Sequence, residues 1–256
     1  MLKSLASAFL MYSRIPMPKV EWKEENRRYA LCFFPLIGVV IGILFCAWSQ
    51  VCSVLGFNDI IRGAVAMFIP FAVTGGIHMD GYCDVNDARA SWGDRDKKLS
   101  IMKDSHIGAF ASIHMAVYLI LQTAVFSQIS GLKMILCCGL CFVLSRALSG
   151  IAAVTFRSAN KEGTLQSFVR PSHRTLTLVS LCITALIVYL AVFILSPVSG
   201  VAVLIVSVVV FLYYRRTAYK EFGGTTGDIA GWFLQLEELL LPFAVIIAER
   251  VREVLV

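Results

Sequence analysis

Charged residues are scarce in this chain. Its 256 residues include 23 Lys and Arg and 17 Asp and Glu, together 16%, whereas hydrophobic residues make up 58%. A soluble domain has roughly 25% charged and about 45–50% apolar residues. The composition therefore excludes an ordinary soluble domain and predicts a polytopic integral membrane protein. Because no polar linker is long enough to separate two halves, we expect residues 1–256 to form one membrane domain.

The N-terminus lacks the features of a cleaved signal peptide. Its apolar stretch, Leu5 to Tyr12, is short, Arg14 interrupts it, and Pro16 and Pro18 follow without a small-residue cleavage site. We therefore expect this segment to be retained, as an interfacial helix that ends at Ser13.

Signs of a disulfide framework and of a nucleic-acid module are also missing. Seven of the eight cysteines lie in or near apolar runs, where a thiol packs as a small hydrophobe. Cys138 and Cys141 have the spacing of a zinc or redox half-site, but a single pair inside an apolar run is not specific. The net charge of +6 is explained by membrane orientation and by anionic lipid, so we expect no nucleic-acid partner.

Long apolar runs are what the chain does contain. A bilayer-spanning helix needs about 20 apolar residues. The candidate spans are Ala30–Asn58, a marginal Gly63–Met79, Ile107–Leu132, Met134–Phe156, Thr175–Tyr214 divided in two at 196–200, and Ile229–Ala248, the least secure because it carries Glu237 and Glu238. The sequence thus predicts an all-α bundle with six or seven transmembrane helices.

The distribution of basic residues predicts the orientation of these spans. With a cytoplasmic N-terminus and seven spans, eighteen Lys and Arg fall in the inner segments and four in the outer ones. This bias agrees with the positive-inside rule. We therefore expect the N-terminus and the polar loops to face the cytoplasm.

One polar stretch, Thr74 to Phe110, holds six of the seventeen acidic residues. Asp80, Asp84 and Asp87 are spaced i, i+4, i+7, which places them on one face of a helix. A divalent cation would relieve their repulsion, and Mg²⁺ prefers carboxylate oxygens. The stretch therefore predicts a magnesium site, although a solvated acidic helix face would have the same pattern.

A glycine-rich segment near the C-terminus is the second candidate. Gly223, Gly224 and Gly227 allow a sharp turn before an apolar helix, whose exposed N–H groups could hold a phosphate. Asp228 falls on the same predicted side of the membrane as Asp80. An ordinary turn between two spans would look alike.

Further candidates are basic residues and histidines. Lys103 stands out among the basic residues of the acidic stretch because it precedes a span directly, and cations beside carboxylates are typical of phosphoryl transfer. His78 and His106 bracket the stretch and could contact substrate. Arg146 interrupts an apolar run and is expected to face inward, the alternative being that its side chain snorkels to the interface.

The motifs resemble those of one family. GGIHMDGYCDVND at 75–87 and IMKDSHIGAF at 101–110 are similar to the signature of the cobalamin synthase family, also called adenosylcobinamide-GDP ribazoletransferases. SRIPMP at 13–18 and GGTTGD at 223–228 match as well, so the resemblance covers nearly the whole chain. His106 stands where the family usually has Arg, and Gln235 where it commonly has Glu.

The resemblance implies an activity. It implies Mg²⁺-dependent transfer from adenosylcobinamide-GDP to α-ribazole, or its 5′-phosphate, with release of GMP. Asp80, Asp84 and Asp87 would bind the metal, and Asp84 and Asp104 would be catalytic, Asp104 as a further ligand or as the base. The substrate-binding residues would be Lys103, His78, His106, Arg146, Gly223, Gly224, Gly227 and Asp228.

Two other classes of function are compatible with clustered acids in a membrane protein. One is an alcohol phosphotransferase acting on a nucleotide-activated lipid, but its usual spacing of Asp residues is not met. The other is a transporter, whose acids would be ion or substrate ligands, but the spans show no obvious paired repeat. We expect location in the inner membrane, with the site facing the cytoplasm, and regard a homo-oligomer as open.

Overall fold

The computed structural model describes residues 1–160 and 163–255, and within these ranges the chain is helical without strands. The elements are α1 (Leu2–Tyr12), α2 (Glu24–Arg27), the 3₁₀ helix η1 (Ala30–Phe33), α3 (Phe34–Leu55), α4 (Asp59–Thr74), α5 (Ile77–Ala90), α6 (Arg95–Ile101), α7 (Ala109–Ser127), α8 (Leu132–Thr155), α9 (Thr164–Val169), α10 (Arg174–Leu195), α11 (Pro197–Glu221) and α12 (Gly227–Leu255).

The prediction of an all-α bundle with six or seven spans is confirmed. Six of the described helices, α3, α7, α8, α10, α11 and α12, are long and apolar enough to cross a membrane. Ser196 divides the long apolar run into α10 and α11, and its hydroxyl accepts a hydrogen bond from the Ser199 N–H at the start of α11. The least secure run is helical throughout as α12, and both of its glutamates are buried.

The marginal run Gly63–Met79 is not one continuous helix. α4 and α5 meet at an angle of 98°, so only the bent pair together could form a seventh span. Gly75 and Gly76 between them have φ angles of +68° and +79°, a left-handed conformation that glycine adopts without a steric penalty. A Cβ at Gly75 would also meet the side chain of Arg14, which packs across the break.

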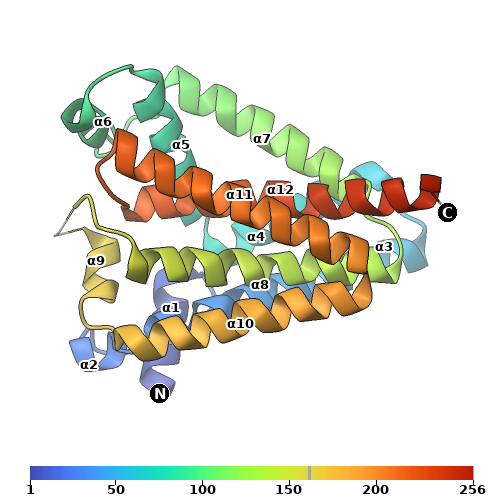
Figure 1. Ribbon diagram of the computed structural model, residues 1–256, viewed down its shortest axis with the longest axis horizontal. Coiled ribbons are helices and arrows are strands. Elements are labelled where there is room, and N and C mark those ends of the chain that lie inside the picture. The colour runs from blue at the N-terminus through green and yellow to red at the C-terminus, as the bar shows by residue number, and fades with distance from the viewer. Residues whose placement is uncertain (161–162, 256) are drawn as a thin grey trace.

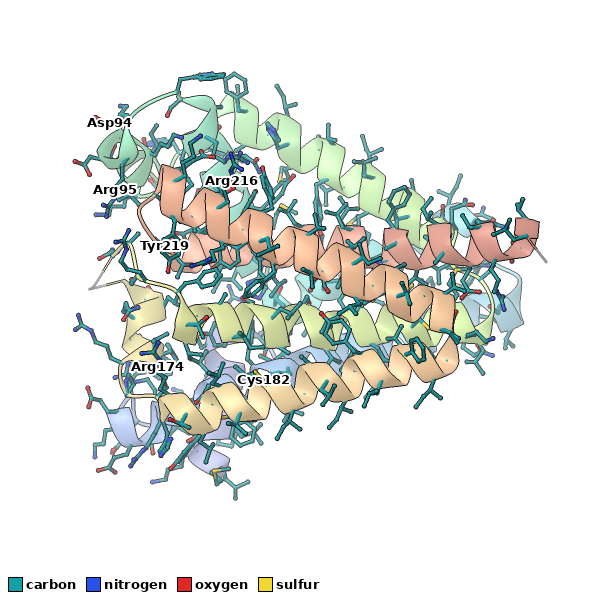
Figure 2. The ribbon with its side chains drawn as sticks, in the orientation of Figure 1. Asp94, Arg95, Arg174, Cys182, Arg216 and Tyr219 are labelled. Atoms are coloured by element: carbon teal, nitrogen blue, oxygen red, sulfur yellow. The ribbon has the colours of Figure 1, made fainter. Side chains whose placement is uncertain are left out.

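The two ends of the bundle differ in the short helices that they carry. α2, α6 and α9 lie together at one end, on the left in Figure 1, and the C-terminus lies at the opposite end. Figure 2 shows Asp94 and Arg95 at the start of α6, Tyr219 near the end of α11 and Arg174 at the start of α10, all at this same left end. We call it the polar end, because it also carries the acidic stretch.

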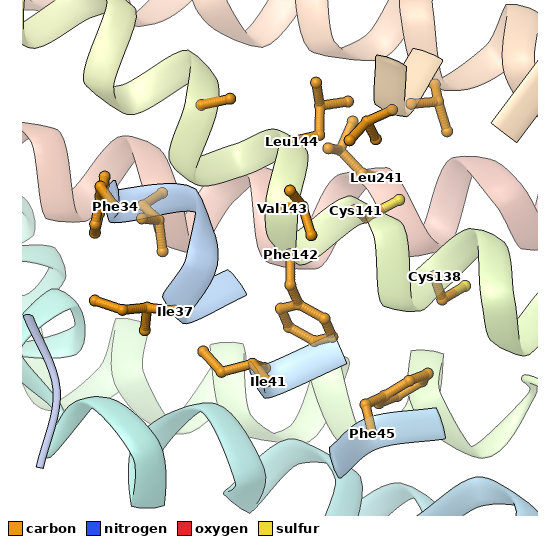
Figure 3. Close-up of a cluster of buried hydrophobic side chains, with 14 of the residues drawn as sticks. Phe34, Ile37, Ile41, Phe45, Cys138, Cys141, Phe142, Val143, Leu144 and Leu241 are labelled. Carbon is orange, nitrogen blue, oxygen red and sulfur yellow. The ribbon is translucent and has the colours of Figure 1, made fainter. Parts of the chain in front are cut away.

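The core of the bundle lies between α3 and α8. Figure 3 shows Phe34, Ile37, Ile41 and Phe45 of α3 beside Phe142 and its neighbours on α8. A Cβ at Gly42 would lie 2.6 Å from the carbonyl oxygen of Gly139, so only glycine permits this close approach. Small residues at a four-residue spacing, here Gly38 and Gly42, are typical of tightly packed membrane helices.

Candidate functional site

A cavity of about 930 Å³ opens at the polar end of the bundle. We call it the chamber. It is enclosed by the end of α1, the α4–α5 break, α5, the loop before α7 and the first turn of α12. The polar side chains that line it are Ser13, Arg14, Thr74, Asp80, Asp84, Lys103, Asp104, Ser105, His106 and Asp228. Six of the twelve sequence-predicted site residues are therefore brought together.

Glycines in α5 and α12 determine how the carboxylates meet. A Cβ at Gly81 would lie 2.7 Å from the Cα of Asp228, and one at Gly231 would lie 3.1 Å from the carbonyl oxygen of His78. Glycine at both positions lets the two helices approach closely. This contact places Asp228, on α12, beside Asp80 and Asp84, on α5, although the two segments are far apart in the sequence.

Asp80, Asp84 and Asp228 share the chamber without a cationic partner. Among the described residues, none of the three forms an ion pair with a Lys, Arg or His side chain. Asp228 accepts one long hydrogen bond, 3.4 Å, from the Thr226 hydroxyl. Like charges gathered in this way repel one another unless a cation or a proton is bound.

Asp87 has a different environment from its neighbours on α5. Its two carboxylate oxygens accept hydrogen bonds from the backbone N–H groups of Gly108, at 2.6 Å, and Ala111, at 2.8 Å. It therefore caps the N-terminus of α7 and does not line the chamber. A role of Asp87 in metal binding stays a prediction, and Asp228 joins Asp80 and Asp84 as the third chamber carboxylate without a cationic partner among the described residues.

Asp104 and His106 form a local pair on the exposed loop before α7. The Asp104 carboxylate accepts a hydrogen bond from the His106 backbone N–H at 3.0 Å, and the same oxygen lies 2.7 Å from Nδ1 of the ring. The backbone N–H and then the ring hold the pKa of Asp104 below its usual value. A carboxylate with a lowered pKa is a weak proton acceptor, which favours a charge-holding role over that of a base.

Lys103 is the cation that the acidic stretch contributes to the chamber. Three other basic residues of this stretch have partners elsewhere. Arg89 and Lys98 both pair with Glu221, at 3.3 and 2.8 Å, and the Arg95 guanidinium packs against Gly223. Lys103, singled out by its position before a span, therefore remains the candidate for binding a phosphate.

The glycine-rich segment is only partly available to a ligand. The N–H of Gly224 donates to the carbonyl oxygen of Ala218 at 2.9 Å, and the segment pairs with residues 157–159. Gly223 and Gly224 have left-handed φ angles of +74° and +155°, and neither lines the chamber. Gly227 opens α12 and lines a smaller cavity behind the chamber. A phosphate role for the first two glycines stays a prediction.

Arg146 faces inward, as expected, but it does not line the chamber. It is fully buried, and its guanidinium forms an ion pair of 2.7 Å with Glu238 of α12. His78 is also buried and lines the smaller cavity. A contact of Arg146 with substrate therefore stays a prediction, and the structure gives it a partner that the sequence did not reveal.

Arg14 is the chamber residue that sequence reasoning missed. Its backbone N–H donates to the carbonyl oxygen of Val73 at 2.7 Å, which anchors the segment after α1 to the end of α4. Its side chain then reaches over Gly75 into the chamber. Arg14 belongs to the SRIPMP motif, so the sequence did mark this residue, but the motif alone did not indicate what its side chain contacts.

The donor set of the chamber fits a hard divalent cation. Asp80, Asp84 and Asp228 offer carboxylate oxygens, the ligands that Mg²⁺ prefers. Within the described part of the chain, no group of three His, Cys, Asp or Glu side chains is arranged so that it could hold a metal ion by itself. Mg²⁺ usually takes one or two carboxylates and completes its shell with water and substrate phosphates, so a complete protein cage is not required.

Comparison with known proteins identifies the family. The model for "Cobalamin-5-phosphate synthase" matches residues 4–246. The chain belongs to the cobalamin-5-phosphate synthase family. It is 43% identical to an adenosylcobinamide-GDP ribazoletransferase of Lachnoclostridium phytofermentans, over 98% of this chain and 95% of the relative. Similar proteins of the same name occur in Clostridium botulinum, with 30% identity over 94% of this chain and 96% of the relative, and in Desulfitobacterium hafniense, with 30% identity over 93% and 94%.

No solved structure matches the chain. As a member of this family, the protein is an enzyme of cobalamin synthesis. It is a transferase with membrane-spanning helices. Most of the residues that line the chamber belong to the motifs that carry the resemblance, so the chamber is the candidate active site.

Proposed function

We propose that this protein transfers the adenosylcobinamide phosphate group from adenosylcobinamide-GDP to α-ribazole, or to its 5′-phosphate, with release of GMP and with dependence on Mg²⁺. The observation that carries the proposal is the set of three carboxylates, Asp80, Asp84 and Asp228, that share the chamber without a cationic partner among the described residues. The names of the relatives support the choice of substrates.

The chamber residues would position the diphosphate of the donor. Asp80, Asp84 and Asp228 would hold the cation, which when bound neutralises charge on the phosphate oxygens. Lys103 and Arg14 line the chamber on other sides and would contact the same oxygens. Opposite charges on several sides of the diphosphate would fix its orientation, and positioning supplies much of the rate in phosphoryl transfer.

The chemical step is a substitution at phosphorus. A ribose hydroxyl oxygen of the acceptor attacks the phosphorus that bears the cobinamide arm, the bond from this phosphorus to the GMP oxygen breaks, and GMP leaves. The hydroxyl proton would pass to water in the chamber, because Asp104 is a weak acceptor while it is hydrogen-bonded to His106 and Asp84 would be bound to the cation. Asp104 would instead contribute negative charge at the mouth of the chamber.

We further propose that the protein lies in the inner membrane and that its chamber opens toward the cytoplasm. The support is the charge bias of the sequence, in which the segments that meet at the polar end hold most of the basic residues. This orientation would give the site direct access to water-soluble substrates.

A direct assay tests the proposed function. Purified protein in lipid nanodiscs is supplied with adenosylcobinamide-GDP, α-ribazole and Mg²⁺, and GMP is measured. We expect GMP to appear together with a cobalamin product, to stop with excess EDTA and to return with added Mg²⁺. A lipid phosphotransferase would ignore these substrates, and a transporter would leave both chemically unchanged. Release of GMP without Mg²⁺ would contradict the metal dependence alone.

A further inference from the structure

Four polar residues that line the chamber lie on one connection between helices. Residues 91–108 join α5 to α7 and include α6, and we call them the α5–α7 connection. Lys103, Asp104, Ser105 and His106 of this connection line the chamber, and all four are exposed. The position of Lys103 relative to the chamber carboxylates therefore depends on the contacts that hold this connection against the bundle.

Apolar burial holds the α5–α7 connection only in part. None of the seven residues of α6 is buried, although Leu99 and Ile101 are half-buried against the core. Met102, directly after α6, is buried, with 7% of its surface exposed. A helix as short as α6 is not stable by itself in water, so contacts with the rest of the chain must fix it.

Three consecutive residues at the end of α11 supply polar contacts of this kind. The Lys98 ammonium lies 2.8 Å from Oε2 of Glu221 and 5.8 Å from the ring centroid of Phe222. A Cβ at Gly223 would clash with the guanidinium of Arg95, so glycine leaves the room that this side chain occupies. We call residues 221–223 the α6-binding surface. Figure 1 shows α6 beside this end of α11, at the polar end of the bundle.

Lys98 is the enclosed cation of α6. Its side chain is only 13% exposed, whereas the residue before it, Lys97, is exposed and forms no ion pair among the described residues. Lysine is rarely enclosed to this degree unless it is paired. The contact of Lys98 with Glu221 therefore fixes the helix, and the ammonium is not free to enter the chamber.

We propose that Lys98 is a positioning residue for the reaction, which docks α6 on the α6-binding surface and so holds Lys103 where it contacts the diphosphate of the donor. This inference rests on the proposed function. The link between the two lysines is the backbone, because the N–H of Lys103 donates to the carbonyl oxygen of Ser100 in α6 at 3.1 Å. Gly223, the first glycine of the glycine-rich segment, then serves to admit α6 and not to bind a phosphate.

The first test separates binding of the two substrates. Lys98→Met removes the ammonium but keeps an unbranched side chain, and Glu221 keeps Arg89 as its partner at 3.3 Å, so the variant should fold. We expect the KM for adenosylcobinamide-GDP to rise about tenfold, less than the roughly 10²-fold that a misplaced group can cost, while the KM for α-ribazole stays unchanged. Lys97→Met is the matched control and should behave as the wild type.

A double-mutant cycle tests whether the effect passes through Lys103. Lys103→Met should itself raise the KM for adenosylcobinamide-GDP, because the diphosphate loses a cation. If Lys98 acts by positioning Lys103, adding Lys98→Met to this variant should raise the KM no further. An equal effect of Lys98→Met with and without Lys103 would overturn the inference. An unchanged KM in Lys98→Met alone, or an equal rise in both KM values, would overturn it as well.

Amide hydrogen exchange tests the docking of α6 without any substrate. In nanodiscs, we expect the backbone amides of residues 95–103 to exchange about tenfold faster in Lys98→Met than in the wild type or in Lys97→Met. Gly223→Ala, whose new Cβ would displace Arg95, should change the exchange in the same direction.

The outcomes distinguish this inference from the proposed function. Unchanged exchange in Lys98→Met would contradict the inference, while release of GMP by the wild type would leave the proposed function intact. Failure of the wild type to release GMP from adenosylcobinamide-GDP would overturn the proposed function, and with it the role of Lys98 in binding the donor.

Discussion

Two carboxylates of the chamber differ in their partners from two other carboxylates of the chain, Glu238 and Glu221. Glu238 is buried against Arg146 at 2.7 Å, and Glu221 is held by both Arg89 and Lys98. Asp84 and Asp228 have no such cation among the described residues, although they lie beside each other in the chamber.

This difference distinguishes carboxylates that pair with a neighbouring cation from carboxylates that do not. A charge inside a membrane bundle is stable when an opposite charge is packed against it, and such a pair fixes the two helices that carry it. Carboxylates that share an open cavity without cations are instead ready for a ligand that brings positive charge. We therefore expect the helix bundle and the reaction to depend on different acidic residues.

The largest expected effect is on turnover. Asp84→Asn removes a negative charge from the chamber while keeping the shape of the side chain, so we expect kcat/KM for GMP release to fall by about 10²- to 10³-fold, as for loss of one electrostatic group at other active sites. The protein should remain inserted and folded. Asp96→Asn, an exposed aspartate on α6 outside the chamber, is the matched control and should keep its activity. Equal activity of the two variants would contradict the comparison.

The next effect is on stability. Glu238→Gln leaves the Arg146 guanidinium buried without its counter-charge, so we expect the free energy of unfolding to fall by about 3–5 kcal/mol, measured by denaturation in detergent. The double variant Arg146→Met, Glu238→Leu should recover most of the loss, because no unpaired charge remains. Glu237→Gln, next in the chain and without a hydrogen-bond partner for either oxygen among the described residues, is the control and should change stability little.

A smaller effect is expected one turn away from the carboxylates proposed to bind the metal. Asp87→Asn keeps one oxygen to accept a hydrogen bond at the start of α7 but loses the charge and the second acceptor. We expect a loss of about 1 kcal/mol in the free energy of unfolding, as for other helix caps. The apparent Mg²⁺ affinity in the turnover assay should not change. A loss of Mg²⁺ affinity of tenfold or more in this variant would indicate that Asp87 binds the metal.

The smallest effect concerns pH. The pKa of Asp104 is lowered by His106, so its charge is retained as the pH falls until that lowered pKa is reached. His106→Ala removes the ring contact but keeps the backbone N–H, which is the larger cause. The pKa should therefore rise slightly, and the acid limb of the kcat/KM profile should begin at a higher pH. An acid limb that moves to lower pH would contradict a role for ionised Asp104.

Local features of the fold were predictable from the sequence. The uncharged runs predicted the membrane-spanning helices, because a bilayer tolerates few charges. The turn residues that begin at Ser196 predicted the break between α10 and α11. The i, i+4, i+7 pattern correctly placed Asp80, Asp84 and Asp87 on one helix. It could not separate their roles, because the capping of α7 by Asp87 depends on where Gly108 lies in space.

Long-range contacts were the part that the sequence could not supply. The pairing of Arg146 with Glu238 joins residues 92 positions apart, and no periodicity connects them. The sharp bend at Gly75 and Gly76 was hidden by an apolar run that looked continuous. The approach of Asp228 to Asp80 depends on Gly81. From the sequence alone, this glycine indicates only a weaker helix.

Cation binding tests the central claim most directly. Mn²⁺, which accepts the same oxygen ligands as Mg²⁺, can be titrated by electron paramagnetic resonance into the protein in nanodiscs with GDP present. We predict saturable binding by the wild type, an affinity at least tenfold weaker in Asp84→Asn and Asp228→Asn, and an unchanged affinity in Asp87→Asn. Unchanged binding in the first two variants, or a loss confined to Asp87→Asn, would contradict the account.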